Sequence, residues 1–476
     1  MQRVPLQPDD TQSPEALVRF LGECRETARR RGRAQLVSIS IESGVLDPLA
    51  VLESIYEPGE LHFYCERPSE DLAVAGADAV LRFTIEGESR FAQARRFVLD
   101  TLEHAIVVGD AALPFAGPHF FAGFGFHDRS ARGEAFPAAT LFVPRWQVGR
   151  RGDRFAAVAN LMVDPDSAIE PMVGRVWRAS AKFRSFEYGT VAEAAREAGP
   201  ARIDSTEVGE DGFFERSVAT ALELIAARTF DKIVLARALD LRSEGAFHPL
   251  ALLNTLRGRF PDCYAFSFGN GEGQSFIGAS PERLVRMQAG RIETEALAGS
   301  APRGRTASED AALGSGLLKS EKDLREHALV VGSLVRRLEA AGLKAEVSAR
   351  PRLKQMSNVQ HLHSPVSAAT RVGMHVLDTV CALHPTPAVG GSPREAACPH
   401  IRALEPFERG LYAGPIGWAD SEGGGEFLVG IRSALVDGAR ARLYAGAGIV
   451  EGSIPERERQ ETDLKFRAMR DVFAPA

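Results

Sequence analysis

The sequence has few cysteines, no long apolar run and no excess of positive charge. Its five cysteines are scattered through 476 residues and none belongs to a C-x-x-C pair, which argues against a disulfide framework and favours a reduced compartment. No apolar run approaches the roughly 18 residues that a transmembrane helix needs. The formal net charge of −6 argues against nucleic acid or an anionic membrane surface as the main partner.

Several well-known site motifs are also missing. The chain contains no P-loop, no G-x-G-x-x-G after an expected strand, no H-E-x-x-H and no G-x-S-x-G. His361 and His363 have no third metal ligand nearby in the sequence, so zinc is not expected. The first ten residues hold no apolar segment of the kind that begins a secretory signal, and we therefore expect a cytoplasmic protein.

The chain is long enough for two lobes. From about residue 34 to residue 146, short alternating apolar runs between Gly, Pro and Asp predict antiparallel strands. The aromatic residues of Phe120–Phe126 are expected in the core. A polar segment over about residues 180–210 is typical of a linker. We therefore expect a strand-rich N-terminal lobe over residues 1–200 and a catalytic region over residues 201–476.

A glycine-rich run marks the C-terminal region. Arg442–Tyr444 is strand-like, and Gly446 and Gly448 then predict a break where positive φ is allowed and a ligand can approach bare N–H groups. Ser453, with a proline and a glutamate after it, predicts a helix start.

The last helix carries two charged residues on one face. Leu464, Ala468 and Val472 are predicted to form its buried apolar stripe, and Glu461 and Lys465 lie at the end of this stripe. The two charges form either an ordinary i, i+4 salt bridge or a carboxylate for a metal beside an ammonium for an anion.

Two further charged side chains fall where strands are expected. Lys232 begins a strand and shares its face with Val234 and Ala236, so it is either a snorkelling lysine or a functional amine. Glu282 directly follows a Ser-Pro pair, and this rigid turn makes it a candidate acid–base group.

Carboxylates recur at the same spacing on two helices. Asp323 and Glu326 are three residues apart on a helix that starts near Ser320, and Glu458 and Glu461 repeat this spacing on the last helix. Together they could hold one hard cation through oxygen atoms. The expected buried stripe of the first helix, however, leaves Glu326 on the opposite face, which by itself favours a solvated charge; that stripe consists of Leu324, Ala328, Val331, Val335 and Leu338.

Taken in chain order, a set of motifs resembles the chorismate-utilising enzymes, the family of anthranilate, aminodeoxychorismate, isochorismate and salicylate synthases. The resemblance covers roughly Phe213 to Phe473 and implies an α+β fold with two large antiparallel β-sheets packed face to face and helices on the outside. The motifs are Lys-Ile-Val-Leu-Ala-Arg237, Gly-Ala-Ser-Pro-Glu282, Leu-Ala-Gly-Ser300, Glu-Lys-Asp-Leu-Arg-Glu-His327, Gln-His-Leu362, Ala-Gly-Ala-Gly448 and Arg-Gln-Glu-Thr-Asp-Leu-Lys465.

Details of these motifs point to one branch of the family. Lys232 resembles the members that use water, which implies that no glutamine amidotransferase subunit is needed. Ala298 stands where aminodeoxychorismate synthases carry a lysine. The run His384-Pro-Thr-Pro-Ala is similar to that of isochorismate synthases, whereas salicylate synthases usually lack the second proline. The resemblance therefore implies conversion of chorismate to isochorismate, with salicylate formation or mere chorismate binding as alternatives. The long N-terminal lobe is similar to that of the enzymes in the menaquinone branch.

The resemblance also implies roles for individual residues. Lys232 would be the base that activates water and Glu282 the acid that protonates the departing C4 hydroxyl. Mg²⁺ would be bound by Glu326 and Glu461, with Asp323 and Glu458 acting on it through water. The residues implied to contact the substrate are Gly299, Ser300, His361, Thr386, Tyr412, Arg432, Gly446, Ala447, Gly448 and Lys465.

Overall fold

The computed structural model describes residues 1–4, 13–184, 202–356 and 359–473. Of the expected linker, residues 185–201 lie outside these ranges. The neighbouring parts of the linker belong to helix α4 (Ile169–Arg184) and strand β9 (Ile203–Glu207).

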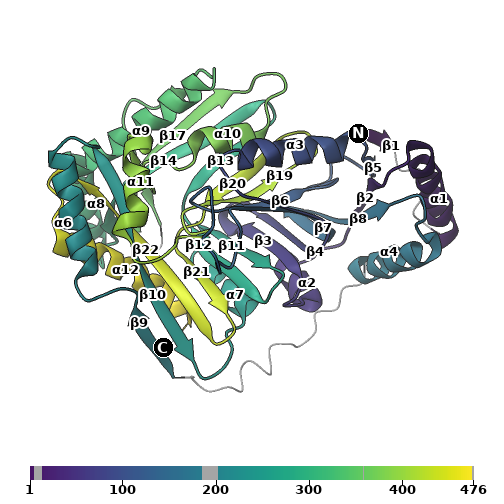
Figure 1. Ribbon diagram of the computed structural model, residues 1–476, viewed down its shortest axis with the longest axis horizontal. Coiled ribbons are helices and arrows are strands. Elements are labelled where there is room, and N and C mark those ends of the chain that lie inside the picture. The colour runs from purple at the N-terminus through teal and green to yellow at the C-terminus, as the bar shows by residue number, and fades with distance from the viewer. Residues whose placement is uncertain (5–12, 185–201, 357–358, 474–476) are drawn as a thin grey trace.

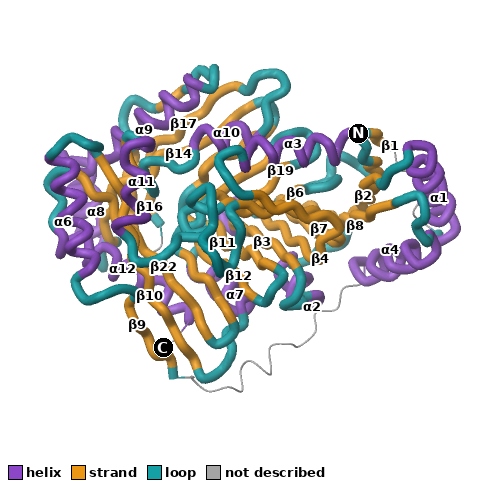
Figure 2. The backbone as a smooth tube through the Cα atoms, viewed as in Figure 1, coloured by secondary structure: helices purple, strands orange, loops and turns teal. Residues whose placement is uncertain are grey.

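Antiparallel strands form the centre of the molecule (Figure 2). Within the described residues, pairing joins 22 strands into one sheet, and only β1–β5 and β2–β5 pair in parallel. The strands other than β9 are β1 (Gln2–Val4), β2 (Gln35–Glu42), β3 (Leu61–Arg67), β4 (Leu72–Ile85), β5 (Ile106–Val108), β6 (Phe120–Phe124), β7 (Ala139–Arg151), β8 (Arg154–Val163), β10 (Lys232–Ser243), β11 (Tyr264–Asn270), β12 (Gln274–Ser280), β13 (Arg283–Gln288), β14 (Arg291–Pro302), β15 (Glu346–Val347), β16 (Arg352–Gln355), β17 (Val359–Ala369), β18 (Gly391–Ser392), β19 (Pro415–Ala419), β20 (Gly425–Val429), β21 (Ser433–Asp437) and β22 (Arg440–Val450).

Helices cover the outside of the strands (Figure 1). Helices α1 and α4 lie at one end of the molecule, α6, α8 and α12 lie at the other, and α3 and α10 run along one edge. This arrangement confirms the predicted α+β class with antiparallel strands inside and helices outside, but the described strands pair into one large sheet where two were expected. The helices other than α4 are α1 (Pro14–Arg31), α2 (Pro48–Ile55), α3 (Arg90–Glu103), α6 (Phe213–Ala226), α7 (Pro249–Arg259), α8 (Ala307–Lys319), α9 (Glu321–Ala340), α10 (Val376–Leu383), α11 (Arg394–Leu404) and α12 (Pro455–Phe473), with a 3-10 turn at Pro68–Glu70.

The largest hydrophobic core draws on both halves of the chain. Strand β3 pairs with β11 and strand β6 pairs with β19, so residues before and after the expected lobe boundary share one sheet. Phe63 and Phe121 stack in this core with their ring centroids 4.3 Å apart. Every residue of β6 is buried, as the aromatic run predicts. The C-terminal strands are therefore held in place by N-terminal ones.

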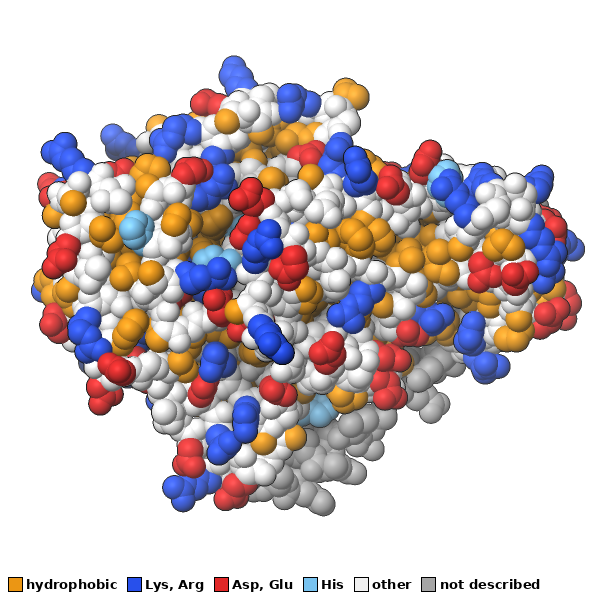
Figure 3. All heavy atoms as spheres, viewed as in Figure 1, with side chains coloured by type: hydrophobic (Ala, Val, Ile, Leu, Met, Phe, Trp, Pro, Cys, Tyr) orange, Lys and Arg blue, Asp and Glu red, His pale blue; other side chains and the backbone are white. Residues whose placement is uncertain are grey.

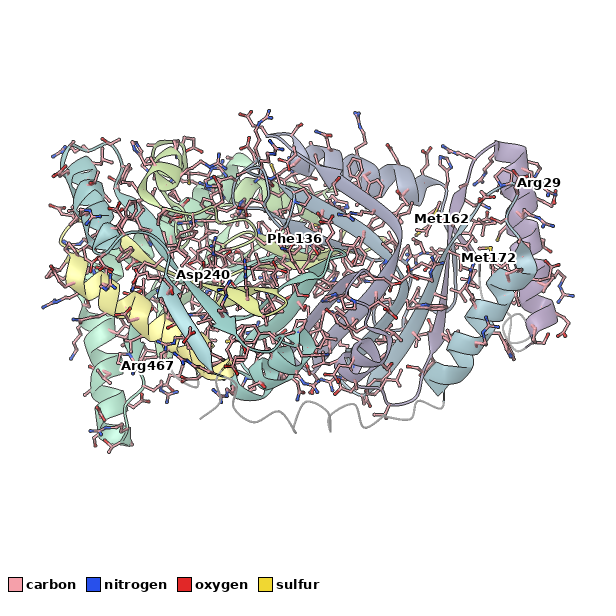
Figure 4. All side chains as sticks on the ribbon, turned by 60° about the horizontal axis from the view of Figure 1, so that its bottom comes forward. Arg29, Phe136, Met162, Met172, Asp240 and Arg467 are labelled. Carbon is pink, nitrogen blue, oxygen red and sulfur yellow. The ribbon has the colours of Figure 1, made fainter. Side chains whose placement is uncertain are left out.

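A smaller core closes the end of the molecule that lies far from the last helix. Met172 of α4 belongs to this core and lies at the same end of the molecule as Arg29 of α1, while Asp240 and Arg467 lie toward the opposite end (Figure 4). On the face drawn in Figure 3, acidic and basic side chains alternate over the surface. None of the helices in the described ranges combines the length and the apolar character needed to cross a membrane.

Candidate functional site

A cavity in the C-terminal half brings most of the predicted site residues together. It lies where β14, β17 and β22 meet the N-terminal part of α9 and the middle of α12. A second cavity, which Arg151, Arg286 and Trp418 help to line, holds none of the predicted residues. The predicted residues that line the first cavity are Glu282, Gly299, Ser300, Asp323, Glu326, His361, Tyr412, Arg432, Gly446, Gly448, Glu461 and Lys465.

Two glycines on β22 leave room for side chains that pack against this strand. The prediction of a break at these glycines is wrong: β22 continues through both of them and pairs with β10, with Gly448 opposite Val234. A Cβ at Gly448 would lie 2.6 Å from Glu326 Oε1, and one at Gly446 would lie 2.8 Å from the Tyr412 hydroxyl. The glycines are therefore needed for space and not for positive φ.

Gly299 is the glycine of the site that does need positive φ. Its φ is +75°, and the register between β14 and β17 shifts between Ala298 and Ser300. A bulge of this kind bends a strand locally and redirects a side chain. Here it places Gly299 against the start of α9, where an added Cβ would lie 3.1 Å from Asp323 Cβ.

Lys232 is buried and paired with a glutamate. Its side chain is 1% exposed, and Nζ donates a 2.8 Å hydrogen bond to Glu326 Oε1. The alternative of a snorkelling lysine is therefore wrong. A buried ammonium needs a charged partner, and Glu326 supplies it from a position 94 residues later in the chain.

The buried face of α9 differs from the predicted one. The helix buries His327, Val330, Leu334 and Leu338, whereas Ala328 of the predicted stripe is exposed. Glu326 precedes His327 and therefore lies at the edge of the buried face, 14% exposed and against the cavity. The prediction that Glu326 lies opposite the buried face was wrong. It counted Ala328 as a core residue, but a side chain as small as alanine occurs on buried and exposed faces alike.

Helix α12 is also rotated from its predicted orientation. Leu464 is 55% exposed, and the buried face consists of Glu458, Thr462, Phe466 and Met469 together with the C-terminal turn. Two polar residues occupy this face because each has a charged partner: Lys322 donates to Glu458 and Arg237 donates to Thr462. The predicted stripe of Leu464, Ala468 and Val472 is therefore wrong for Leu464.

Glu461 and Lys465 form the i, i+4 pair and also line the cavity. Lys465 Nζ lies 2.6 Å from Glu461 Oε1 and 2.7 Å from the carbonyl oxygen of Gly446, which it reaches as a hydrogen-bond donor. Burial would raise the pKa of Glu461, but the Lys465 ammonium holds it below its ordinary value. The two alternatives drawn from the sequence, a salt bridge and a site, are thus compatible.

Glu282 also lines the cavity and is shielded from solvent. It is 4% exposed and precedes β13. Burial is the largest cause that raises its pKa to about 8; Glu295 adds to this effect, and Lys232 and Lys354 oppose it. Its carboxyl group is therefore protonated at neutral pH and can donate a proton.

Arg432 points an unpaired charge into the cavity. No described residue forms a hydrogen bond or an ion pair with its guanidinium group, and burial lowers its pKa without removing the charge. Nearby, His361 Nδ1 lies 2.8 Å from Ser300 Oγ, and His361 Nε2 is buried without a partner. Burial lowers the pKa of His361 to about 3, so the ring is neutral. These groups can bind an anion and a hydroxyl group.

The carboxylates of the two helices are mostly paired with lysines. Three of them pair with lysine ammonium groups: Glu326 with Lys232 at 2.8 Å, Glu461 with Lys465 at 2.6 Å, and Glu458 with Lys322 at 2.9 Å. Burial raises the pKa of Asp323, and its neighbours Glu326 and Glu461 add to this rise. Within the described residues no three metal-ligating side chains converge on one point. A cation at Glu326 and Glu461 would therefore need further oxygen ligands from substrate or water.

Four predicted residues lie outside the cavity lining, and one of them is Lys232, which reaches the cavity through Glu326. Ala447 packs into the hydrophobic core on the other face of β22, so only its backbone is near the site. Glu458 is buried behind Glu461, against Lys322. Thr386 is buried beyond Glu282 and acts on the pKa of that carboxyl.

Sequence reasoning missed three charged residues near the site. Lys322 lines the cavity beside Asp323, and Glu295 and Lys354 form a buried pair near Glu282. Glu295 had no clear signal in the sequence, because it follows the polar residues Glu293 and Thr294 at the start of β14. Lys354 had none, because its strand is short and polar.

Comparisons with known proteins show the family of the chain. Residues 20–474 match the family described as chorismate binding enzymes. The chain is 37% identical over 450 residues to the salicylate biosynthesis isochorismate synthase of Pseudomonas aeruginosa, covering 94% of this chain and 92% of that protein. It is 33% identical over 456 residues to the isochorismate synthase MenF of Bacillus subtilis, covering 93% and 94%. The solved structure of MenF, the menaquinone-specific isochorismate synthase from Escherichia coli, superposes with a TM-score of 0.76 at 28% identity, covering 95% of this chain and 99% of that one.

The fold and the similar proteins thus define an enzyme whose candidate site is this cavity. The chain belongs to the family of chorismate binding enzymes.

Proposed function

We propose that the protein is an isochorismate synthase, which converts chorismate to isochorismate reversibly. The observation that carries this proposal is one cavity that is lined by a protonated carboxylic acid, Glu282, and that the buried Lys232 reaches through its hydrogen bond to Glu326. The similar proteins that span nearly the whole chain are named isochorismate synthases, which supports it.

The reaction moves a hydroxyl group from C4 to C2 of the ring. Lys232 takes a proton from water, whose oxygen forms a bond to C2 as the ring double bonds shift. Glu282 gives its proton to the C4 hydroxyl, which leaves as water when its C–O bond breaks. One water enters and one leaves, so atoms and charge balance. Lys232 must first release its own proton and its hydrogen bond to Glu326.

The two carboxylates of chorismate need cationic partners. The unpaired Arg432 guanidinium can bind one carboxylate through two parallel hydrogen bonds, and Tyr412 lies beside it. Lys465 offers an ammonium group next to the Gly446 carbonyl. The neutral His361 with Ser300 can contact a ring hydroxyl group.

Magnesium fits the remaining part of the cavity. Glu326 and Glu461 would hold Mg²⁺ with the ring carboxylate and water as further ligands, while Asp323 and Glu458 would hold the surrounding water. When bound, the ion would neutralise the ring carboxylate and draw electron density from the ring. Its arrival would also compete with Lys232 for Glu326.

The test is product identification with purified protein, chorismate and Mg²⁺. We expect isochorismate, formed without ammonia and without a glutamine amidotransferase subunit. The same equilibrium mixture should form when the assay starts from isochorismate. If chromatography shows mainly salicylate and pyruvate, the protein is a salicylate synthase instead; if chorismate binds without turnover, it is a binding protein.

A further inference from the structure

We propose that Glu295 is a positioning residue for Glu282: its buried carboxylate accepts the N–H of the peptide bond that follows Glu282 and fixes a negative charge there, which keeps the acid protonated. This inference rests on the proposed function, because it takes Glu282 as the proton donor of the reaction. It goes further by assigning a role to a group outside the cavity lining.

Three strands lock the Glu295 carboxylate in place. Its Oε1 accepts the Arg283 N–H of β13 at 3.1 Å. Its Oε2 accepts a 2.8 Å hydrogen bond from Lys354 Nζ of β16 and lies 2.8 Å from His363 Nε2 of β17. The residue is 9% exposed. With both oxygens engaged from three directions, the carboxylate cannot turn away from Glu282.

The locked carboxylate is permanently charged. Burial would raise the pKa of Glu295, but His363 and then Lys354 hold it well below its usual range. A buried charge is costly unless it is paired and hydrogen-bonded, and Glu295 meets both conditions. A fixed negative charge disfavours ionisation of a second carboxyl group nearby, as in carboxylate pairs of known catalytic sites.

Among the charged groups around Glu282, Glu295 disfavours its ionised form and the lysines favour it. Lys232 of β10 and Lys354 of β16 favour the ionised form of Glu282, as does the Thr386 hydroxyl, whereas burial and Glu295 oppose it. The pair Glu295–Lys354 therefore has a negative end, the Glu295 carboxylate, which accepts the Arg283 N–H directly after Glu282, and a positive end, the Lys354 ammonium. The other charged groups that line the cavity are Lys322, Asp323, Glu326, Arg432, Glu461 and Lys465.

The sign of the expected pH effect follows from the role of Glu282. An acid works only while protonated, so turnover is lost as pH rises through its pKa, which is about 8 in the free protein. Glu295→Gln keeps the shape and an acceptor for the Arg283 N–H but removes the charge. We expect the pKa of Glu282, and with it the alkaline limb of the kcat/KM profile, to fall by about one pH unit.

A matched control and an opposite variant exclude a merely structural explanation. Glu293→Gln makes the same change two residues away on β14, where the side chain is 45% exposed and 3.7 Å from Arg283, and should leave the profile in place. Lys354→Met removes the positive end of the unit and should move the profile to higher pH. Damage to the fold would lower activity in both Glu295→Gln and Lys354→Met without shifting their profiles in opposite directions.

The decisive measurement does not need turnover. The C=O stretching band of protonated Glu282 can be titrated by infrared spectroscopy in the full-length protein, with and without Mg²⁺, and assigned by its loss in Glu282→Gln. A band that titrates at lower pH in Glu295→Gln supports the proposal, and an unchanged titration overturns it. If the wild-type protein forms no isochorismate, the proposed function fails, and the infrared titration still decides the role of Glu295.

Discussion

Gly448 should be irreplaceable even by alanine. The added Cβ would lie 2.6 Å from Glu326 Oε1 and 3.0 Å from Lys232 Cε. An ordinary carbon–oxygen contact is about 3.3 Å or longer, so the Glu326 carboxylate must move by roughly 0.7 Å. Overpacking of this kind costs about 1–3 kcal/mol, which a protein of this size tolerates. A displacement approaching 1 Å at a reacting group, in contrast, lowers the rate by on the order of 10²-fold.

The assay compares turnover and stability in the same variant. For Gly448→Ala we expect kcat to fall by about 10²-fold while the melting temperature falls by only a few degrees. Gly316→Ala is the control, because no atom lies within 4 Å of its added Cβ and the helical position should gain slight stability. Wild-type kcat and wild-type Mg²⁺ dependence in Gly448→Ala would refute the claim that Lys232 and Glu326 act from their observed positions.

Three further predictions concern the charged groups. Lys232→Ala and Glu282→Gln should each lower kcat by about 10²-fold or more with chorismate still bound, and the double variant should be scarcely worse. Kinetics and calorimetry on all three variants check this. Normal turnover by Lys232→Ala would mean that water is activated elsewhere. Glu461→Gln should weaken Mg²⁺ binding in titration calorimetry at an unchanged melting temperature, because it removes one negative ligand oxygen, whereas full activity in excess chelator would exclude a magnesium site. Arg409→Met should lower the free energy of unfolding by about 3–5 kcal/mol in denaturant titrations, because it leaves the fully buried Glu405 without its partner, and a change below about 1 kcal/mol would contradict this.

Strand periodicity was the most reliable local signal in the sequence. It predicted that Lys232 shares a face with Val234, and in the structure Val234 lines the cavity while Lys232 reaches it through Glu326. Alternation in a strand depends only on the backbone, so it holds whatever packs against the sheet. The motif resemblance then identified most of the cavity lining.

Helix orientation and long-range pairs could not be predicted in this way. On α12 the apolar Leu464 is exposed and the polar Thr462 is buried, because Thr462 accepts a hydrogen bond from Arg237 of β10, a contact that no local pattern predicts. The pair of Lys232 with Glu326 and that of Glu295 with Lys354 join residues far apart in sequence, and no local pattern encodes such contacts. Both depend on which strands and helices meet in the folded chain.

The register between β10 and β22 limits how this enzyme can change during evolution. Lys232 pairs with Val450 and Arg242 pairs with Arg440, without a bulge between them. A one-residue insertion or deletion within either strand would turn every following side chain to the opposite face of the sheet. It would turn Lys232 away from Glu326, or the glycines away from the cavity, in a single step. Length variation among descendants of this sequence should therefore collect in the tight turn at Gly438, and not along these two strands, where only substitutions can accumulate.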